Sequence, residues 1–374
     1  MKKRHIVISV LIILLILIIM TALCVKETGK PGFKENIRIK SPLKYDIADA
    51  RRDYMLPEEK PEKGEKTGFD IMVIKLDARG NSQWSRTYGG EYYDWADHII
   101  PVKDGGYLLA AKTYSFDEAY QGVYILKIDS KGNSTHVYRF DTPYDTTLKF
   151  PLDYGYVEAG RTYTDAGDNY GVNLTCVNPD GGYKWVKTFG NDYFEWGYTA
   201  VSTKDGHFVT TGQPDNLTDR DMEDVFVSER DKQGDYRWNK CFGGNGYDRG
   251  YSIAALKQGG YIISGLSCSY GSGCDDAYLI RLDADGNSIW AKTYGGENHD
   301  RAYAVEETQD KGFIIAGSTM SFNRDDRFEM YVIRTDADGN MKWVKTFGAL
   351  KDMAAYSVAV TKDGGYVVAG ASGK

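Results

Sequence analysis

The chain has 374 residues, of which 42% are hydrophobic, with 42 glycines, 29 tyrosines and a formal net charge of -7. This composition excludes a disordered or low-complexity chain and indicates a turn-rich globular protein. From residue 68 onward there are 32 basic and 44 acidic residues, a balance of -12. Nucleic acid, with its negatively charged phosphates, is therefore a poor partner.

The first 24 residues are predicted to target the chain to a membrane. A basic start precedes Ile6 to Leu23, an 18-residue run without a charge. The run is close to spanning length, which favours a signal anchor with the body of the protein outside the cell. A cleaved signal peptide is the alternative and would give a secreted protein. Cys24 also resembles the acceptor of a lipoprotein processing site, although Leu23 stands where a small residue is usual.

Residues 25–67 are predicted to form a polar stalk or linker. They hold 11 Lys/Arg, 9 Asp/Glu and four prolines. Mixed charge with few apolar residues favours a solvated spacer that holds the following domain off the membrane. The alternative is that residues 37–47 pack against that domain as a strap.

Residues 68–374 carry a repeated unit of four short strands. In the clearest copy, 278–282 and 288–294 flank the turn Ala284-Asp285-Gly286-Asn287, and 303–307 and 313–316 flank the turn Asp310-Lys311-Gly312. Glycine, aspartate and asparagine suit tight hairpin turns, and no apolar period of 3.6 residues is present. One landmark column recurs every 49 to 53 residues: Trp84, His136, Trp185, Trp238, Trp290 and Trp343.

Six copies with four strands each predict an all-β fold, a six-bladed β-propeller of four-stranded blades. The domain begins with the third and fourth strands of a unit and ends, at residues 356–370, with the first and second. We therefore expect a two-plus-two ring closure, in which the N-terminal and C-terminal hairpins complete one blade and remove the sheet edges.

The motif W-x-K-T-Y-G-G followed by D-G-G-Y-I-x-A-G resembles the propeller repeats of prokaryotic secreted and cell-surface proteins. The turn L-D-A-D-G-N-x-x-W is distantly similar to the repeats of quinoprotein-type (PQQ-like) propellers. The resemblance covers residues 68–370 and implies the fold rather than an activity. The vicinal cysteine pair and metal site of quinoprotein enzymes have no match here, so quinone chemistry is not expected.

An acidic residue precedes the first strand of every copy. In a closed ring these carboxylates would surround one mouth of the channel, where their repulsion could recruit a cation, calcium above all. The alternative is that each carboxylate caps backbone amides of its own loop and needs no ligand. The column consists of Asp94, Asp145, Glu195, Asp248, Asp300 and Asp352.

The longer connections of every unit fall on one face, beside this column. Loops on a rigid scaffold commonly carry binding sites, and aromatic and cationic residues adjoin the acids here. Arg249 and Arg301 could pair with an anionic group, or else neutralise the neighbouring Asp248 and Asp300. The candidate ligand-binding residues are Tyr93, Trp95, Trp196, Arg249 and Arg301.

The cysteines show no C-x-x-C or Cys/His metal spacing. Cys268 and Cys274 bracket a five-residue loop between two strands, and an extracytoplasmic compartment would permit a disulfide there. Cys176 and Cys241 occupy non-equivalent positions in different copies and are expected to be buried free thiols.

The sequence therefore predicts a membrane-tethered, extracytoplasmic binding or adhesion module that presents an acidic, aromatic loop face to a glycan, cation or protein partner. Acidic loops that only keep a surface protein soluble are a simpler interpretation. The alternative function is a polysaccharide hydrolase or lyase, because a pair of loop carboxylates suffices for that chemistry. No catalytic residue is identified.

Overall fold

The computed structural model describes residues 68–113, 115, 122–140, 156–163, 170–177, 183–189, 195–203, 205–214, 224–231, 235–273, 275–323, 326–348 and 351–374. The predicted membrane segment 1–24, the stalk 25–67, Asp145 and Cys274 lie outside these ranges. Within the described part we find no helix with the length and hydropathy needed to cross a membrane. All of its regular elements are β-strands, which confirms the all-β prediction.

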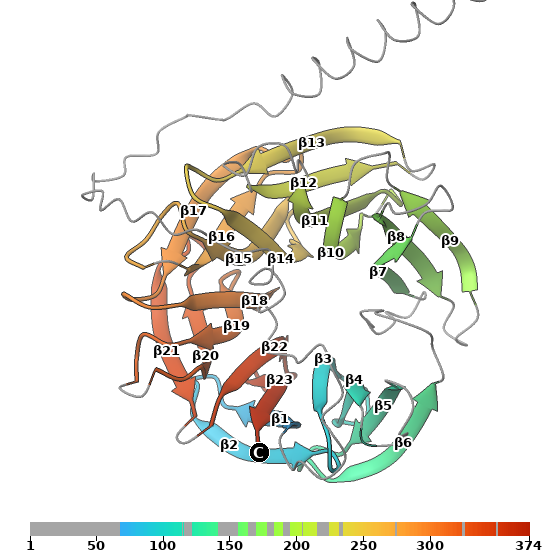
Figure 1. The fold of residues 1–374 in the computed structure, drawn as a ribbon, viewed down its shortest axis with the longest axis vertical. Coiled ribbons are helices and arrows are strands. Elements are labelled where there is room, and N and C mark those ends of the chain that lie inside the picture. Colours follow the sequence, from blue (N-terminus) through green and yellow to red (C-terminus); the bar gives the residue numbers. More distant parts are fainter. Residues whose placement is uncertain are drawn as a thin grey trace, which may run out of the picture.

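The strands form antiparallel sheets arranged around a common axis, a propeller-like fold (Figure 1). The terminal sheet has the order β2-β1-β23-β22, from Ser82–Tyr88, Phe69–Leu76, Tyr366–Gly373 and Met353–Val360. The next sheets along the chain are β3 (Asp94–Pro101), β4 (Tyr107–Thr113), β5 (Gly122–Ile128) and β6 (Ser134–Phe140), then β7 (Tyr156–Tyr163), β8 (Tyr170–Val177) and β9 (Tyr183–Phe189).

Three further four-stranded sheets follow. They comprise β10 (Glu195–Ser202), β11 (Phe208–Pro214), β12 (Val225–Arg230) and β13 (Tyr236–Phe242); β14 (Asp248–Ala255), β15 (Tyr261–Ser267), β16 (Asp276–Leu282) and β17 (Ser288–Tyr294); and β18 (Asp300–Glu307), β19 (Phe313–Thr319), β20 (Glu329–Thr335) and β21 (Met341–Phe347). The sheet β7-β8-β9 has three described strands, and the residues before β7, 141–155, lie outside the described part.

The two ends of the described chain share the terminal sheet. Strand β1 pairs with β23 along its whole length, from Phe69 opposite Gly373 to Leu76 opposite Tyr366. The buried Lys75 ammonium lies 2.9 Å from an Asp363 carboxylate oxygen in the β22–β23 turn. Backbone hydrogen bonds and an ion pair therefore hold segments nearly 290 residues apart.

The repeated sequence D-x-D-G-N forms the turn between the third and fourth strands. Oδ1 of Asp283 accepts the backbone N–H groups of Asp285 (2.9 Å) and Asn287 (2.7 Å). The side chain of Asn287 returns a hydrogen bond to Oδ2 at 2.9 Å. Gly286 has a φ of +76°, a conformation that side chains with a Cβ rarely adopt. The motif therefore specifies this turn locally.

The same turn docks on the tryptophan of the preceding sheet. A Cβ on Gly286 would lie 2.7 Å from the indole of Trp238, and Lys240 Nζ reaches Asn287 Oδ1 at 2.5 Å. The arrangement recurs between other neighbouring sheets, at Gly339 with Trp290, Gly132 with Trp84 and Gly80 with Trp343. The two landmarks of the repeat, the tryptophan and the turn glycine, are therefore two halves of one joint between sheets.

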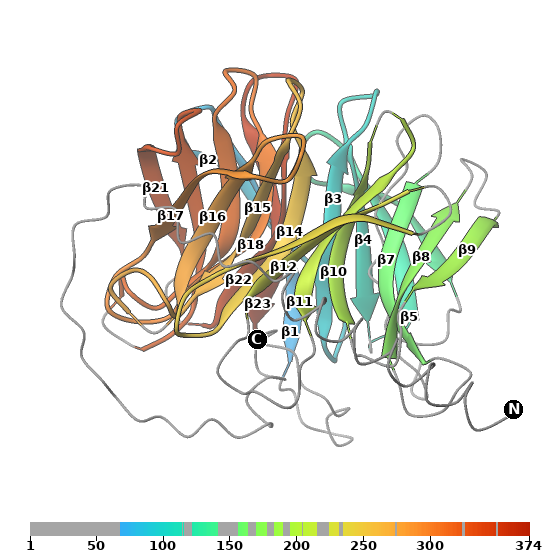
Figure 2. The ribbon, with the colours of Figure 1, turned by 90° about the horizontal axis from the view of Figure 1, so that it is seen from above.

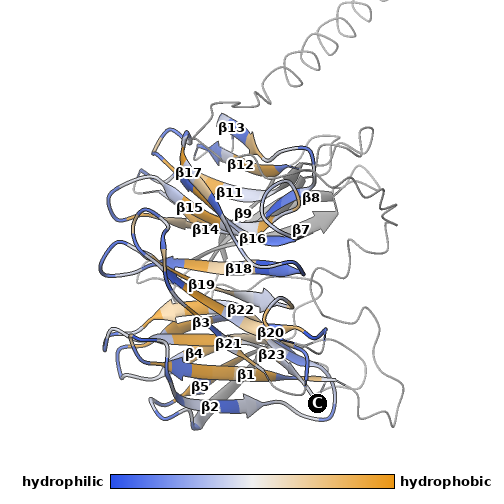
Figure 3. Cartoon of the chain, turned by 90° about the vertical axis from the view of Figure 1, so that its left-hand side faces the viewer, coloured by the Kyte–Doolittle hydropathy of each residue, from blue (hydrophilic) through white to orange (hydrophobic). Residues whose placement is uncertain are grey.

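The strands nearest the axis carry a β-bulge at one fixed position (Figure 1). The bulged residues include Tyr251, Tyr303 and Tyr356, whose neighbouring ring centroids lie 5.2 Å apart. They pack with Trp95 and Leu266 in a central apolar cluster. The connections lie on two opposite faces, and apolar residues concentrate along the strands between them (Figures 2 and 3).

Candidate functional site

Three members of the acidic column are buried and hydrogen-bonded within their sheets. Asp94, Asp248 and Asp300 are all 0% exposed. Oδ2 of Asp248 accepts the Gly244 N–H at 3.0 Å and the Ser269 hydroxyl at 2.6 Å. Equivalent bonds join Asp94 to Gly90 and Ser115, and Asp300 to Gly296 and Ser321. These carboxylates cap loops, which is the alternative that the sequence left open.

Asp352 does not occupy the position of these three carboxylates. By strand register, the equivalent of Asp300 in the last copy is Met353, because Asp300 pairs with Thr319 and Met353 with Ser372. Asp352 lies one residue earlier, is exposed, and accepts the Phe328 N–H at 3.0 Å. Its assignment to the column is wrong. For Glu195 and Trp196 the structure describes only the backbone of β10.

Among the described residues, no three His, Cys, Asp or Glu side chains are grouped closely enough to hold a metal ion. Oδ2 of each buried column member instead bonds to one backbone amide and one hydroxyl, which come from two neighbouring connections. The calcium expectation stays a prediction.

Carboxylates of neighbouring sheets nevertheless meet in pairs at the same edge. A Cβ on Gly295 would lie 2.4 Å from an oxygen of Asp300 and 2.7 Å from one of Asp276. Asp94 pairs with Asp70 around Gly89, and Asp248 pairs with Asp224 around Gly243, in the same way. Burial and the nearby Asp300 charge raise the pKa of Asp276 to about 6.

We expect these groups to make the protein less stable as the pH rises through neutrality. Burial also raises the pKa of Glu306 to about 7, and its Oε2 accepts the Val360 N–H at 2.8 Å. A carboxyl whose folded pKa exceeds its unfolded pKa stabilises the fold at low pH, and this stabilisation disappears as the pH rises through the folded value. The melting temperature should therefore fall between about pH 5 and pH 8.

Glu306→Gln tests this pH dependence, because glutamine keeps the acceptor without the charge. The variant should be more stable than the wild type at pH 8, by on the order of 1 kcal/mol, and should show a shallower pH profile. Exposed Asp338, changed to Asn, is the matched control and should leave the profile unchanged. A Glu306→Gln profile that coincides with the wild type would contradict the prediction.

The arginines beside the column are committed to buried contacts. Arg301, 8% exposed, places Nη2 2.7 Å and Nε 3.0 Å from Oδ2 of Asp275, which is 0% exposed. Burial opposes the charge of Asp275, but hydrogen bonds from His299 and Tyr247 and the Arg301 charge hold its pKa far below the usual range. One alternative from the sequence was that Arg301 neutralises Asp300. In the structure Arg301 pairs with Asp275 instead.

The other predicted ligand-binding residues are also packed into the structure. Arg249 is 5% exposed and lies over the Tyr247 ring at 5.2 Å. Trp95 is 4% exposed and donates through Nε1 to Asp97 at 3.1 Å. Tyr93 is half-buried, 6.0 Å from the Phe69 ring. Arg249 and Trp95 lie close to the bulges of the inner strands and are buried there, so these two residues do not form an open surface.

The cysteine predictions also need correction. Cys268 is present as a thiol and not as half of a disulfide, and its Sγ lies 3.1 Å from Oδ1 of Asp275, so the predicted Cys268–Cys274 bridge is wrong. The buried carboxylate offers this thiol a polar partner in place of a second sulfur. Cys241, expected to be a free thiol, is disulfide-bonded.

Two exposed aromatic residues, which the sequence analysis missed, lie on the face of the long connections. Tyr270 is 39% exposed and Phe322 50% exposed. They occupy equivalent positions on adjacent sheets, three residues after the ends of β15 and β19. Each ring lies near a third-strand tyrosine, at 6.0 Å from Tyr278 and 5.5 Å from Tyr331. The sequence signal that could have revealed them is the repeated motif [ST]-x-S-[FY], which ends in Tyr270 in one copy and in Phe322 in the next.

Polar residues are exposed on the same face as these two rings. Glu297, Asn298 and Asp326 are exposed on connections of the same face. The Tyr270 hydroxyl donates to the Gly243 carbonyl at 2.7 Å, which fixes the orientation of that ring. Rigid rings beside carboxylate and amide groups combine apolar contact with hydrogen-bonding capacity.

No protein-family model and no curated protein sequence matches the chain. Among solved structures, the α-L-arabinofuranosidase Arb93A from Fusarium graminearum, in complex with an iminosugar inhibitor, is 10% identical, with a TM-score of 0.45 over 82% of this chain and 98% of that one. BBS1N in complex with ARL6DN is 13% identical (TM-score 0.36; 74% and 92% covered). A duf4221 family member from Bacteroides vulgatus is 10% identical (TM-score 0.35; 84% and 98% covered).

Proposed function

We propose that this protein is a membrane-tethered, extracytoplasmic binding module whose long-connection face binds a glycan. In this proposal residues 1–24 anchor the chain, residues 25–67 form the stalk, and residues 68–374 form a six-bladed propeller of the prokaryotic cell-surface type. The observation that carries the binding role is the pair of exposed rings, Tyr270 and Phe322, at equivalent positions on adjacent sheets.

The six-bladed closed ring is supported by the order of the sheets. Five sheets have four described strands, and the terminal sheet combines two strands from each end of the domain. The joint between Gly80 and Trp343 connects this sheet to β18–β21 in the same way as the joints elsewhere in the chain. A ring closed at this sheet would hold both aromatic residues on one rigid scaffold.

A glycan fits the exposed rings better than a metal ion or a highly charged partner. Sugar rings present apolar C–H faces that can pack on exposed aromatic side chains, which otherwise leave unfavourable apolar surface in water. The exposed carboxylates of Glu297 and Asp326 can accept hydrogen bonds from sugar hydroxyls, and the amide of Asn298 can accept or donate them. Contact through a few aromatic side chains on a rigid face is typical of a binding surface.

A glycan array, paired with an assay for new reducing ends, tests the proposal. We expect the purified domain to retain one or more array glycans and to release no reducing ends from them. Retention accompanied by release of product would instead favour the hydrolase or lyase. Absence of retention across neutral and acidic glycans would contradict the glycan-binding function.

A further inference from the structure

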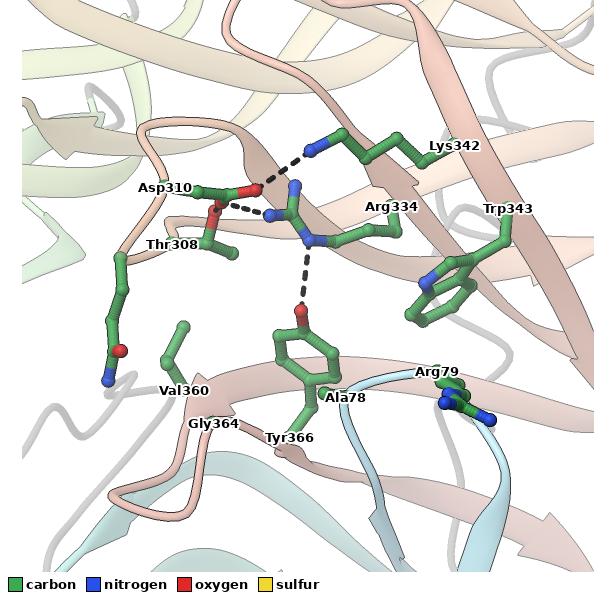
Figure 4. A pocket seen from close by; sticks show the side chains of 11 residues that line it. Ala78, Arg79, Thr308, Asp310, Arg334, Lys342, Trp343, Val360, Gly364 and Tyr366 are labelled. Atoms are coloured by element: carbon green, nitrogen blue, oxygen red, sulfur yellow. Dashed lines mark hydrogen bonds and ion pairs between the residues drawn. The ribbon is translucent and has the colours of Figure 1, made fainter.

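A cavity of ≈ 440 Å³ lies on the opposite face, among the short hairpin turns (Figure 4). It is formed where the sheet β18–β21 meets the terminal sheet. Its walls come from the β1–β2 turn at Arg79, the β18–β19 turn at Asp310, and the β22–β23 turn at Gly364. Segments from both ends of the domain therefore build it together.

The cavity is basic in an otherwise acidic protein. Arg79, Arg334 and Lys342 line it, against the single carboxylate of Asp310. Arg79 and Lys342 are exposed, so their charged groups are accessible to a ligand. The whole chain has a net charge of -7, so this local excess of positive charge differs from the rest of the molecule. A positively charged cavity attracts an anion.

The one carboxylate in the cavity is held in place. Asp310 accepts hydrogen bonds from Arg334, from Lys342 Nζ at 2.8 Å and from Thr308 Oγ1 at 2.6 Å. Burial opposes its charge, but these partners keep its pKa well below the usual range. Arg334 is itself fixed by the Tyr366 hydroxyl, 2.9 Å from Nε. The acceptor and donor groups are therefore preorganised.

An aromatic wall completes the cavity. The rings of Trp343 and Tyr366 line it and lie edge to face, with centroids 5.9 Å apart. A sugar-sized ligand would contact this wall while its polar groups face Arg79, Lys342 and Asp310. Cavities of this volume commonly hold small organic ligands.

The neighbouring joint keeps Arg281, the equivalent of Arg334, but lacks the other two basic residues. Where Trp290 meets the turn at Gly339, the equivalent of Arg79 is Asp338, and the equivalent of Lys342 is Ile289. Both joints keep the tryptophan and the glycine that hold the sheets together. The charges of Arg79 and Lys342 are therefore an addition to the structural joint rather than a requirement of it.

We propose that this cavity binds a sugar acid of the uronate class, a polyhydroxylated ligand with one carboxylate on each sugar ring. The ligand carboxylate would pair with the guanidinium of Arg79 and the ammonium of Lys342, which suit a carboxylate. Its hydroxyls would donate to Asp310, which accepts only. A dianionic phosphate fits less well because Asp310 would repel it.

Isothermal titration calorimetry with digalacturonate, the matching neutral digalactoside and inorganic phosphate tests the assignment. We expect saturable one-to-one binding of digalacturonate, weakened by salt, with the other two at least about tenfold weaker. Arg79→Gln and Lys342→Gln should each weaken digalacturonate binding about tenfold. Arg86→Gln, which removes an exposed arginine from the same hairpin outside the cavity, should leave it unchanged.

Three results would overturn the assignment. These are absence of digalacturonate binding, equal binding of phosphate or the neutral sugar, and equal weakening by Arg86→Gln. Thermal melts of the variants show whether each is folded, and the two cavity variants serve as independent checks. Changing Tyr270 and Phe322 to alanine should leave digalacturonate binding intact. The proposal for the cavity and the proposal for the glycan-binding face are therefore tested independently.

Discussion

Deletion of residues 69–88 is expected to unfold the whole domain rather than one sheet. The deletion removes β1 and β2, including Ile71, Val73, Ile74 and Leu76, whose exposed fractions are 0 to 2%. Full burial of such a side chain stabilises a fold by about 1.5–3 kcal/mol, so the four together approach the whole net stability of a typical domain. The deletion also exposes the edge of β23.

A thermal melt of this deletion, beside the domain that begins at residue 68, measures the effect. We expect the deletion to lose its cooperative transition or to aggregate, because an unpaired strand edge is a template for association. A cooperative melt within a few degrees of the longer domain would show that the terminal sheet does not support the rest of the molecule.

Gly265→Ala is expected to destabilise the protein by about 4 kcal/mol or more, at the upper end of single substitutions. A Cβ at this position would lie 1.7 Å from the carbonyl oxygen of Arg249 on the adjacent strand. That oxygen belongs to the backbone next to the bulge, so relief of the clash requires movement of the inner strand. The same contact recurs at Gly317 and Gly370, which explains the glycine that ends the repeat motif.

Gly364→Ala is the control for Gly265→Ala, because it replaces a glycine where the added Cβ meets no other atom. It measures the free-energy cost of the substitution without a steric clash. Gly364 has a φ of +78° but nothing within 4 Å of its Cβ position. Its replacement should cost only about 1–2 kcal/mol, the strain of the left-handed conformation. Urea melts of the two variants give both free energies of unfolding. Equal costs would mean that strand β14 adjusts easily.

The sequence predicts the all-β class and the position of the turns because these depend on local chemistry. In the turn of residues 283–287, for example, the Asp283 carboxylate accepts the Asn287 N–H and Gly286 supplies the positive φ, so five consecutive residues specify the turn. The tryptophan column was visible for the same reason, although its partner, the turn glycine of the next sheet, emerged only from the structure. The sequence alone does not distinguish a residue that recurs because it joins neighbouring sheets from one that recurs because it binds a ligand.

The candidate site was harder to predict because burial depends on contacts between strands. The acidic column resembled a channel mouth, yet Ser269 and Ser321 reach Asp248 and Asp300 and turn those carboxylates into caps. Asp352 was misplaced by one residue, since only the pairing of Met353 with Ser372 fixes the register. The cavity at Arg79 could not be foreseen, because its walls come from opposite ends of the domain.

The most direct test of the proposed function compares two double variants on the same glycan array. Tyr270→Ala with Phe322→Ala removes the exposed rings of the long-connection face. Ile289→Ala with Met341→Ala removes two equally exposed apolar side chains, at 53% and 47%, from outer strands. We predict that the first pair loses glycan retention and that the second pair retains it. Equal retention by both would contradict the assignment of that face as the glycan-binding surface.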